Sequence, residues 1–400
     1  MAKAITNISS TANDTSTILA TSKRQKLSHH HHHPLIPGIP DHIAQLSLSQ
    51  LPPSLLFSVC HSWRRLIYST SFPPFLSLYA ILSPSPSTSS SSHTSKTHSD
   101  SIQFFNFDPI SSNWHVLPPP PADPPLHLLL RHPSFLSRNL PIQSISVSGN
   151  LVLLAATTHN FSPALSHPLI FNPLSQSWNI GPKLATPRRW CALGACRGAI
   201  YVASGMGTRF SLDVARSLEK WDLHGKKRED KKDPNVNSGG EWEKKTALKD
   251  SRFSRDAIDA VGWRRKLFMV NVKGDAAKEG VVYDVEKDLW EDMPEGMLTG
   301  WRGPVAAMDE EVIYGVDEAK GALRKYNADK DAWEEVMESD RLRGAEQVTA
   351  QGGRVCVVSA SGISVVDVVA APSRLWVVNM PARYEAVAVH VLPRMPDADT

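Results

Sequence analysis

The alternation of apolar and polar residues divides the chain into a short helical segment and a long β-rich segment. After residue 75, short apolar runs recur between turn residues, and helical periodicity is hard to find. Examples are SISVSG at 144–149, LVLLAA at 151–156, KLFMVNV at 266–272 and RVCVVSASG at 354–362. Runs of this length, bounded by Gly, Pro, Asn and Asp, are typical of β-strands. We therefore predict that the second segment is all-β.

The region between residues 35 and 75 carries a helical period instead. Asp41 follows Pro40 and is a favourable helix start, with apolar residues on one face of the turns that follow. After Pro52-Pro53, we expect Ser54 to cap a second helix, in which apolar residues recur at steps of three and four up to Ile67. A segment of about 40 residues holds too little core to be stable alone. We expect it to pack onto something else.

Composition marks segments that lie outside both regions. Residues 1–34 are rich in Ser, Thr and Asn, so we predict a disordered tail. The tail holds a weak nuclear-import pattern at Lys23–Lys26 and a polar tract at His29–His33, which we interpret as solvated. We also expect insert loops at 83–100 and 224–240, and a C-terminal tail at 393–400.

A repeat organises the β-rich segment. YDVEKDLWEDMP, at 283–294, places an aromatic residue and an Asp ahead of a Trp, with seven residues from the aromatic ring to the Trp. FDPISSNW, FNPLSQSW and YNADKDAW keep the same step, and Trp221-Asp222 and Val366-Asp367 begin copies with a later Trp. The six positions are Trp114, Trp178, Trp242, Trp290, Trp333 and Trp376, and the last two intervals are both 43 residues. This period matches one four-stranded blade of a β-propeller.

The repeat predicts how each blade is built. The Asp or Asn after the aromatic residue favours a tight turn, because its side chain bonds to nearby backbone groups. The Trp is expected to bury its ring between neighbouring blades as part of the core. Six Trp residues predict six blades. The first has no inner strand upstream, so we expect the last apolar run, 385–392, to join it and close the ring.

Charge and cysteine content limit the function classes. Residues 1–218 contain no Glu, with 15 Lys and Arg against six Asp, whereas the remainder has 28 against 34. The basic excess is diffuse, so we predict no nucleic-acid site, and no apolar run is long enough to span a membrane. The four cysteines are scattered, which favours a reducing compartment. We interpret Cys191 and Cys196 as buried thiols, not as metal ligands, and expect no metal and no cofactor.

Two stretches carry a resemblance to a known family. Residues 35–79 resemble the F-box, with Ile39-Pro40-Asp41 at its start and Val59-Cys60, Trp63 and Leu66-Ile67 in its second half. Gly205-Met206-Gly207, Glu219, Trp221-Asp222 and Trp242 stand where kelch repeats place Gly pairs, Glu-x-aromatic-Asp and Trp. Over residues 35–392 the chain is similar to plant F-box/kelch-repeat proteins of the Skp-interacting-partner kind, although most of its kelch units lack a Gly pair. The resemblance implies an F-box at 35–79 and a propeller at 75–392.

The resemblance also implies a function. Proteins of this family are substrate receptors of SCF-type cullin-RING ubiquitin ligases, in which the F-box docks on a Skp adaptor and, through it, on cullin and RING subunits. The propeller would hold an unidentified target protein, in the nucleus and/or the cytoplasm, and the chain itself would have no catalytic residues. The adaptor face is expected to be apolar and to comprise Ile39, Pro40, Ile43, Leu46, Leu51 and Leu55.

The blade-to-blade loops indicate a target-binding face. Four Arg residues, two of them beside a Trp, follow their repeat's Trp by 10 to 12 residues and are expected at one face of the ring. These are Arg189, Trp190, Arg252, Trp301, Arg302 and Arg343. Arg and Trp are common at interface hot spots and favour acidic targets. The alternative is that each Arg bonds to carbonyl or acidic groups between blades.

Two other functions stay open. An enzyme is one, but no Ser/His/Asp, paired-Glu or metal-ligand spacing stands out. The other is a non-proteolytic kelch scaffold whose helical segment never meets Skp.

Overall fold

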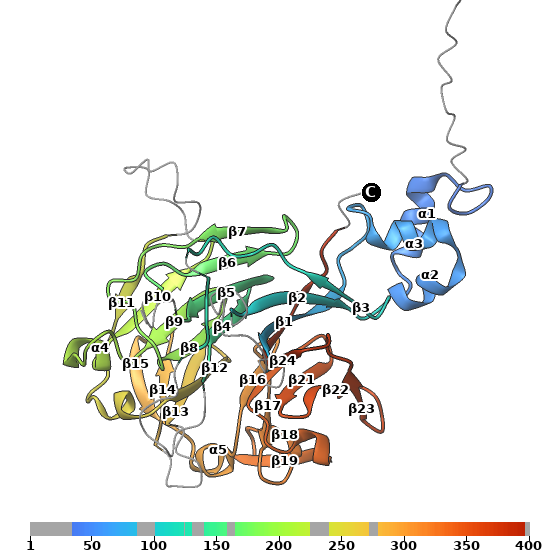
Figure 1. Ribbon diagram of the computed structural model, residues 1–400. Helices are drawn as coiled ribbons and strands as arrows, with labels where there is room; N and C mark the ends of the chain where they lie inside the picture. The colour runs from blue at the N-terminus through green and yellow to red at the C-terminus, as the bar shows by residue number, and fades with distance from the viewer. Residues whose placement is uncertain are drawn as a thin grey trace, which may run out of the picture.

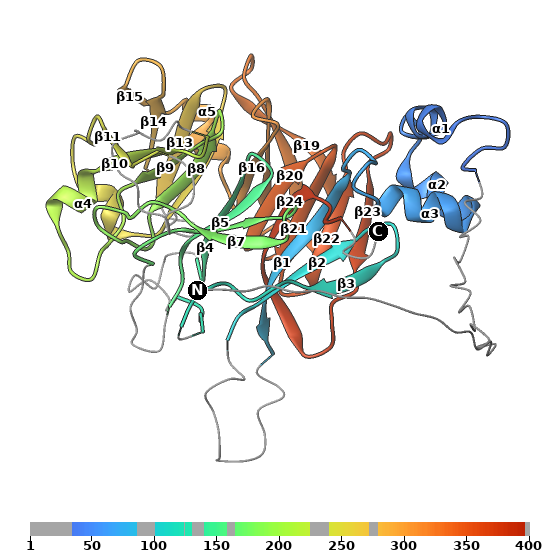
Figure 2. The ribbon, with the colours of Figure 1, turned by 90° about the horizontal axis from the view of Figure 1, so that it is seen from above.

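Six four-stranded antiparallel sheets follow one another around a ring, and a small helical module stands beside it (Figures 1 and 2). The computed structural model describes residues 34–85, 101–123, 125–129, 140–157, 165–224, 240–271 and 279–396. The expected tail, with Lys23–Lys26 and His29–His33, lies outside the described residues, as does most of the two insert loops. The ring confirms the predicted six-bladed propeller with a helical segment ahead of it.

The helical module contains three helices where the sequence predicted two. They are α1 (Asp41–Leu48), α2 (Pro53–Val59) and α3 (His61–Tyr68). Helix α1 starts at the predicted residue. The expected second helix is divided at Cys60, whose backbone is extended, with φ −157° and ψ 167°. The Ser54 cap was wrong, because Pro53 occupies the first turn and the chain enters through Pro52.

In blades two to six the strands follow chain order from the centre outward, and in blade one the last strand of the chain is innermost. Blade one contains β24 (Tyr384–Pro393), β1 (Leu76–Pro84), β2 (Gln103–Asp108) and β3 (Asn113–Val116). Blade two contains β4 (Gln143–Val147), β5 (Asn150–Ala155), β6 (Leu169–Asn172) and β7 (Ser177–Ile180). Blade three contains β8 (Ala192–Cys196), β9 (Ala199–Ala203), β10 (Leu218–Asp222) and β11 (Glu243–Lys245).

The other three blades repeat this plan. Blade four contains β12 (Ile258–Trp263), β13 (Lys266–Asn271), β14 (Gly280–Asp284) and β15 (Leu289–Asp292). Blade five contains β16 (Val305–Met308), β17 (Val312–Asp317), β18 (Ala322–Asn327) and β19 (Ala332–Glu338). Blade six contains β20 (Gln347–Gln351), β21 (Arg354–Ser359), β22 (Gly362–Asp367) and β23 (Arg374–Val378). Short helices α4 (Leu212–Arg216), η2 (Arg252–Arg255), α5 (Glu295–Gly300) and η3 (Asp340–Leu342) lie in the connections.

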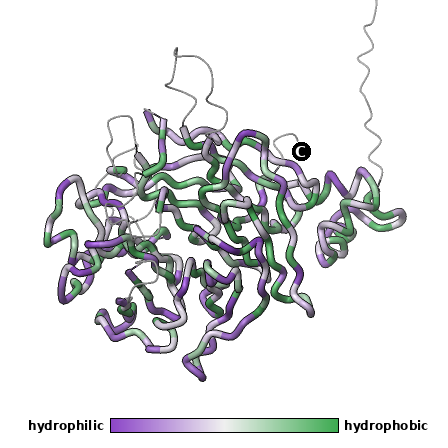
Figure 3. The backbone as a smooth tube through the Cα atoms, turned by 60° about the horizontal axis from the view of Figure 1, so that its bottom comes forward, coloured by the Kyte–Doolittle hydropathy of each residue, from purple (hydrophilic) through white to green (hydrophobic). Residues whose placement is uncertain are grey.

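The last strand closes the ring, as predicted. Strand β24 pairs with β1 from Leu76↔Pro393 to Pro84↔Tyr384, so the C-terminal strand becomes the inner strand of blade one. Closure of this kind satisfies the backbone of the first and last blades and leaves no open end to the array. Figure 3 shows hydrophobic segments along the strands and hydrophilic segments in the turns at the rim.

The predicted Asp/Asn turn occurs in all six blades. In blade four, the Asp284 carboxylate accepts hydrogen bonds from the backbone N–H groups of Glu286 and Lys287 at 3.0 and 2.9 Å. Asp108, Asn172, Asp222, Asn327 and Asp367 accept one or two equivalent bonds. The short polar side chain therefore closes the turn between the third and fourth strands of each blade.

Five of the six repeat Trp residues join neighbouring blades. Each indole N–H donates to a backbone carbonyl in the segment that follows the outer strand of the preceding blade. The pairs are Trp114 to Asn379, Trp178 to Pro118, Trp242 to Pro182, Trp290 to Thr246 and Trp333 to Met297, at 2.7–3.1 Å. Each ring also packs on the aromatic residue that opens its own repeat, at centroid distances of 5.0–5.5 Å. These Trp residues are half-buried and seal the seams at the outer edge of the ring.

Trp376 departs from this pattern, and its assignment to the repeat core was wrong. In blades one, two, four and five, the Trp pairs with the aromatic residue of the repeat, as in Tyr326↔Trp333. In blade six the equivalent pair is Val366↔Leu375, and Trp376 pairs with Val365. A shift of one residue moves a side chain to the other face of a sheet. Leu375 therefore packs in the seam, and Trp376 is 42% exposed.

The ring has two ends, which matter for the surfaces described below. The turn from the first to the second strand of each blade and the turn from the third to the fourth lie at one end, which we term the module end. The second-to-third and blade-to-blade connections lie at the other end, the loop end. The helical module belongs to the module end, because it leads into β1 at Leu76, beside Pro393 of β24.

Candidate interaction surfaces

The helical module presents one apolar face to solvent. Its own core is small, formed by Leu48, Leu56, Leu66, Ile67 and Phe72. All six residues predicted for the adaptor face are exposed: Ile39, Pro40, Ile43, Leu46, Leu51 and Leu55, with Leu46 at 66%. In α1, Ala44 and Leu48 point inward while Ile43 and Leu46 point outward, so one short helix divides its apolar residues between a core and a free face.

Sequence reasoning missed one member of this face. Val59, the last residue of α2, is 53% exposed. It had been placed inside a continuous second helix, where steps of three and four residues assign it to the buried side. The break at Cys60 ends α2 and frees Val59 from that pattern.

The propeller contacts a different side of the module. Ile110, in the β2–β3 turn, packs against the module core. The Tyr68 hydroxyl donates to Asp108 Oδ2 at 2.6 Å, so the Asp that closes the blade-one turn also holds α3. Arg394 follows β24 and donates through Nη2 to the Ser69 carbonyl at 2.7 Å, with its guanidinium 5.2 Å from the Phe75 ring. The adaptor-face residues are therefore not used to attach the module.

The expected target face is only partly at the surface. Trp190 and Trp301 are buried, at 3% and 2% exposed, so their rings belong to the core and not to a binding face. The Trp190 ring supports the Arg189 guanidinium, 4.0 Å from its centroid. The Trp301 indole N–H donates to Asp259 Oδ2 at 3.4 Å. The sequence pattern, a Trp beside an Arg in a loop, does not reveal whether the indole is buried or exposed.

The four Arg residues lie at the loop end, but in two separate pairs. Arg189 and Arg252 flank residues 204–217 of blade three, because the backbone of Arg189 exchanges two 2.9 Å hydrogen bonds with Met206 and η2 packs against α4. Arg302 and Arg343 flank the Glu318–Gly321 turn of blade five: the Arg302 carbonyl accepts from Glu318 at 3.1 Å, and Arg343 Nε donates to the Lys320 carbonyl at 3.2 Å. The four Arg residues therefore do not form one continuous target-binding face.

Comparison with known proteins identifies the family. The chain is 53% identical over 380 residues to the F-box/kelch-repeat protein SKIP25 of Arabidopsis thaliana, and the alignment covers 93% of both chains. The chain belongs to the plant F-box/kelch-repeat family. It is 25% identical over 361 residues to the F-box protein AFR of the same plant, across 84% of this chain and 83% of that one. No family model matches the chain.

Membership places this F-box/kelch-repeat protein among proteins of the substrate-receptor type, and its two parts agree with that role. The helical module is the F-box, and the six blades are the kelch propeller. None of the described helices is long and apolar enough to cross a membrane. Within the same residues, no three His, Cys, Asp or Glu side chains gather as metal ligands would.

The centre of the kelch ring is a narrow channel with a volume of about 350 Å³, lined by the inner strands. Side-chain amides join neighbouring inner strands there. Gln347 accepts from the Val389 N–H and donates to its carbonyl, both at 3.0 Å, and Gln143 donates to the Cys191 carbonyl at 2.7 Å. His390 of the closing strand contacts Ser144 Oγ at 2.9 Å. These polar groups hold one another and strengthen the seams from inside.

The two cysteines that were interpreted as thiols are buried, and Cys191 lines this channel. Burial raises the pKa of Cys191 to about 11 and that of Cys196 to about 12, with the Glu310 carboxylate adding to the shift at Cys196. Both therefore stay protonated at neutral pH, and a protonated thiol is a poor nucleophile and a poor metal ligand.

Proposed function

We propose that this F-box/kelch-repeat protein is the substrate receptor of an SCF-type cullin-RING ubiquitin ligase. In this function the face formed by Ile39, Pro40, Ile43, Leu46, Leu51 and Leu55 docks on a Skp-type adaptor, and the propeller holds a target protein. The receptor does no chemistry itself. It raises the local concentration of the target near the ubiquitin-conjugating enzyme and orients a target lysine.

The exposed apolar face of the F-box is the observation that carries the proposal. A module with a core of five buried residues leaves six large apolar side chains in solvent, three of them, Leu46, Leu55 and Val59, more than half exposed. Contiguous exposed apolar surface is uncommon on soluble proteins unless a partner covers it. Because the propeller attaches elsewhere, through Tyr68, Phe75 and Ile110, that partner is a second protein.

Co-purification with a Skp adaptor tests the proposal. We expect the wild-type chain to retain the adaptor and the Leu46→Asp variant to lose it, with at least about 30-fold weaker binding, because a charge replaces an apolar anchor at the interface. The matched control is Leu174→Asp, which changes a Leu of similar exposure (56%) in the β6–β7 turn. The unfolding midpoints of both variants should equal that of the wild type, since both side chains are exposed.

The outcome also separates the rival function. A wild-type chain that captures proteins through its propeller but never retains a Skp adaptor would be a kelch scaffold and not an SCF receptor. Equal adaptor retention by Leu46→Asp and wild type would overturn the assigned face.

A further inference from the structure

Blade three exposes two large apolar residues at the loop end. Phe210 and Leu212 lie in the β9–β10 connection and are 58% and 59% exposed, while Val214 and Ala215 of the same connection are buried. In the other blades, the described second-to-third strand connections present no exposed apolar side chain of this size. We name Phe210, Leu212 and the loops around them, 181–191, 204–217 and 246–257, the blade-three platform.

The platform is fixed to the ring at both ends. At its start, Gly205 has φ +88°, and a Cβ there would lie 2.8 Å from the Arg189 carbonyl oxygen, so only Gly allows this close approach. At its end, the Leu248 N–H donates to the Arg216 carbonyl at 2.8 Å, and Arg216 Nε donates to the Leu248 carbonyl at 2.9 Å. The loop therefore presents Phe210 and Leu212 on a preformed surface, which lowers the entropic cost of binding.

A buried ion pair lies under the same loop. Arg188 and Glu219 are 1% and 3% exposed and form a salt bridge, and Arg188 also donates to Ser217 Oγ and to the Ser204 carbonyl. Residues 204 and 217 are the two ends of the β9–β10 connection. One guanidinium thus holds both ends together, which supports a defined shape for the loop between them.

The rim of the platform is basic. Apart from the buried Arg188, its loops carry seven basic side chains against three acidic ones, Asp213, Asp250 and Asp256, and Arg252 pairs with Asp250 at 3.1 Å. The basic residues are Lys183, Arg189, Arg209, Arg216, Lys249, Arg252 and Arg255. All of these except the half-buried Arg189 are exposed.

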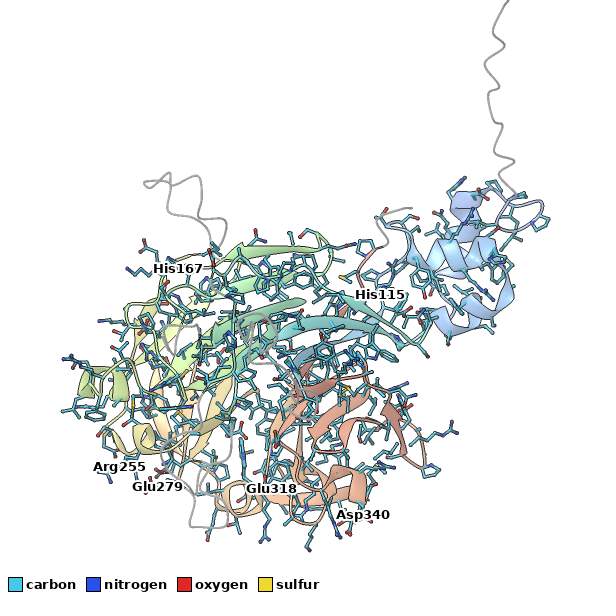
Figure 4. The ribbon with its side chains drawn as sticks, in the orientation of Figure 1. His115, His167, Arg255, Glu279, Glu318 and Asp340 are labelled. Atoms are coloured by element: carbon cyan, nitrogen blue, oxygen red, sulfur yellow. The ribbon has the colours of Figure 1, made fainter. Side chains whose placement is uncertain are left out.

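The loops of blade five lack this basic excess. Its corresponding loops, 293–304, 318–321 and 339–346, hold four basic residues and four acidic ones. Figure 4 shows Arg255 near blade three, and Glu318 and Asp340 at the edge of blade five. The basic excess therefore lies around Phe210 and Leu212 and not around the equivalent loops of blade five.

We propose that the blade-three platform binds an acidic segment of the target protein that carries a large apolar residue. The apolar residue covers Phe210 and Leu212, and the carboxylates pair with the basic rim. This inference rests on the proposed receptor function and names the chemistry of its target. Aromatic and Arg residues at a preformed site supply most of the energy of such interfaces, and opposite charge speeds the encounter.

The position of the platform suits this role. Helix α4 lies at the opposite end of the molecule from α1, α2 and α3 in both ribbon views (Figures 1 and 2). A target held beside α4 therefore leaves the adaptor face of the F-box uncovered, so both partners bind one chain at the same time.

Peptide binding to the full-length chain tests the inference. The probe is a fluorescent Asp/Glu-rich peptide with a central Leu-Phe pair, and the comparison peptides replace Leu-Phe by Ala-Ala or every acidic residue by Lys. We expect the first peptide to bind, with anisotropy that falls as salt is added, and the other two to bind at least about tenfold more weakly. Phe210→Ala with Leu212→Ala, and separately Arg209→Glu with Arg252→Glu, should each weaken binding about tenfold or more.

Matched changes and competing probes decide the result. Leu174→Ala removes an exposed Leu from the module end, Arg343→Glu changes a charge on blade five, and both should leave binding unchanged. No binding of the first peptide, or equal binding by the Phe210→Ala, Leu212→Ala variant, would overturn the inference. Equal binding of the Ala-Ala peptide or of a single-stranded oligonucleotide would do so too, because it would reveal a site for any polyanion. Adaptor retention by the same variants reports on the receptor function separately.

Discussion

The propeller and the F-box use apolar residues in opposite ways. Between each pair of neighbouring blades lies a closed apolar cluster, and five of the six seams are sealed at the rim by a Trp that bonds to the preceding blade. The F-box has one cluster of five buried residues and an exposed apolar face that takes no part in its contact with the propeller. A closed propeller pairs all its blades with one another and buries their apolar faces between them. A three-helix module of this size is too small to bury all of its own apolar residues.

This difference separates stability from function in the molecule. Substitutions in the seams should lower the free energy of unfolding, because they remove packing between two blades of the propeller. Substitutions on the exposed face of α1 and α2 act on binding, because the missing contact belongs to a partner. The experiments below test that separation.

The largest effect is expected where a Trp seals a seam. Trp333→Ala should lower the free energy of unfolding by about 3 kcal/mol, because the Trp333 indole packs on Tyr326 and its N–H donates to the Met297 carbonyl. Trp376→Ala should cost less than about 1 kcal/mol, because this ring is 42% exposed and lies outside the seam. Urea unfolding of both variants measures the difference, and equal losses would contradict the assignment of Leu375 to the sixth seam.

Trp376 also shows how far sequence reasoning reaches. The seven-residue step from the aromatic residue to the Trp identified the blades, because it reflects a strand pair with a fixed turn, and the turn residues Asp284 and Asn327 act as predicted. In blade six the step is ten residues, and the spacing alone does not say which of Leu375 and Trp376 faces the core. Register across strands decides that, and it is set by the longer turn.

The candidate surfaces were predictable to different degrees. The adaptor face was expected from the F-box resemblance of residues 35–79, a segment too short to bury its own apolar residues, and all of its predicted residues are exposed. The loop-end surface was predicted poorly, because loop spacing places Arg189 and Arg302 at one end of the ring without showing which blades share a patch. Phe210 and Leu212 were missed, since nothing in their spacing indicates that Val214 and Ala215 take the buried positions.

The free energy of unfolding of the propeller should depend on pH through a buried histidine. Burial lowers the pKa of His390 to about 4, against an ordinary value of 6.5. The unfolded chain therefore binds a proton at a higher pH than the folded one, so stability is complete above about pH 6.5 and falls as the pH drops toward 4. Between pH 7 and pH 5 we expect the free energy of unfolding to fall by about 2 kcal/mol through this group.

Replacement of the imidazole tests that expectation. His390→Gln should flatten the dependence of unfolding free energy on pH between 7 and 5, at some cost in stability, because the bond to Ser144 changes. The matched control is His115→Gln, at an exposed position on β3 (Figure 4), which should keep the wild-type slope. A His390→Gln slope equal to that of the wild type would mean that His390 has no part in the acid sensitivity of the propeller.

The smallest effect is expected where the two regions meet. Tyr68→Phe removes the hydroxyl that donates to Asp108, so the F-box should be held to the ring by about 1 kcal/mol less, while the seams are untouched. Hydrogen exchange should therefore speed up in α3 and stay unchanged in β2. Tyr384→Phe, a half-buried ring that packs on Phe105 in the propeller, is the control and should leave α3 unchanged. Faster exchange throughout blade one in Tyr68→Phe would show that the F-box supports the propeller, and the separation between the two regions would fail.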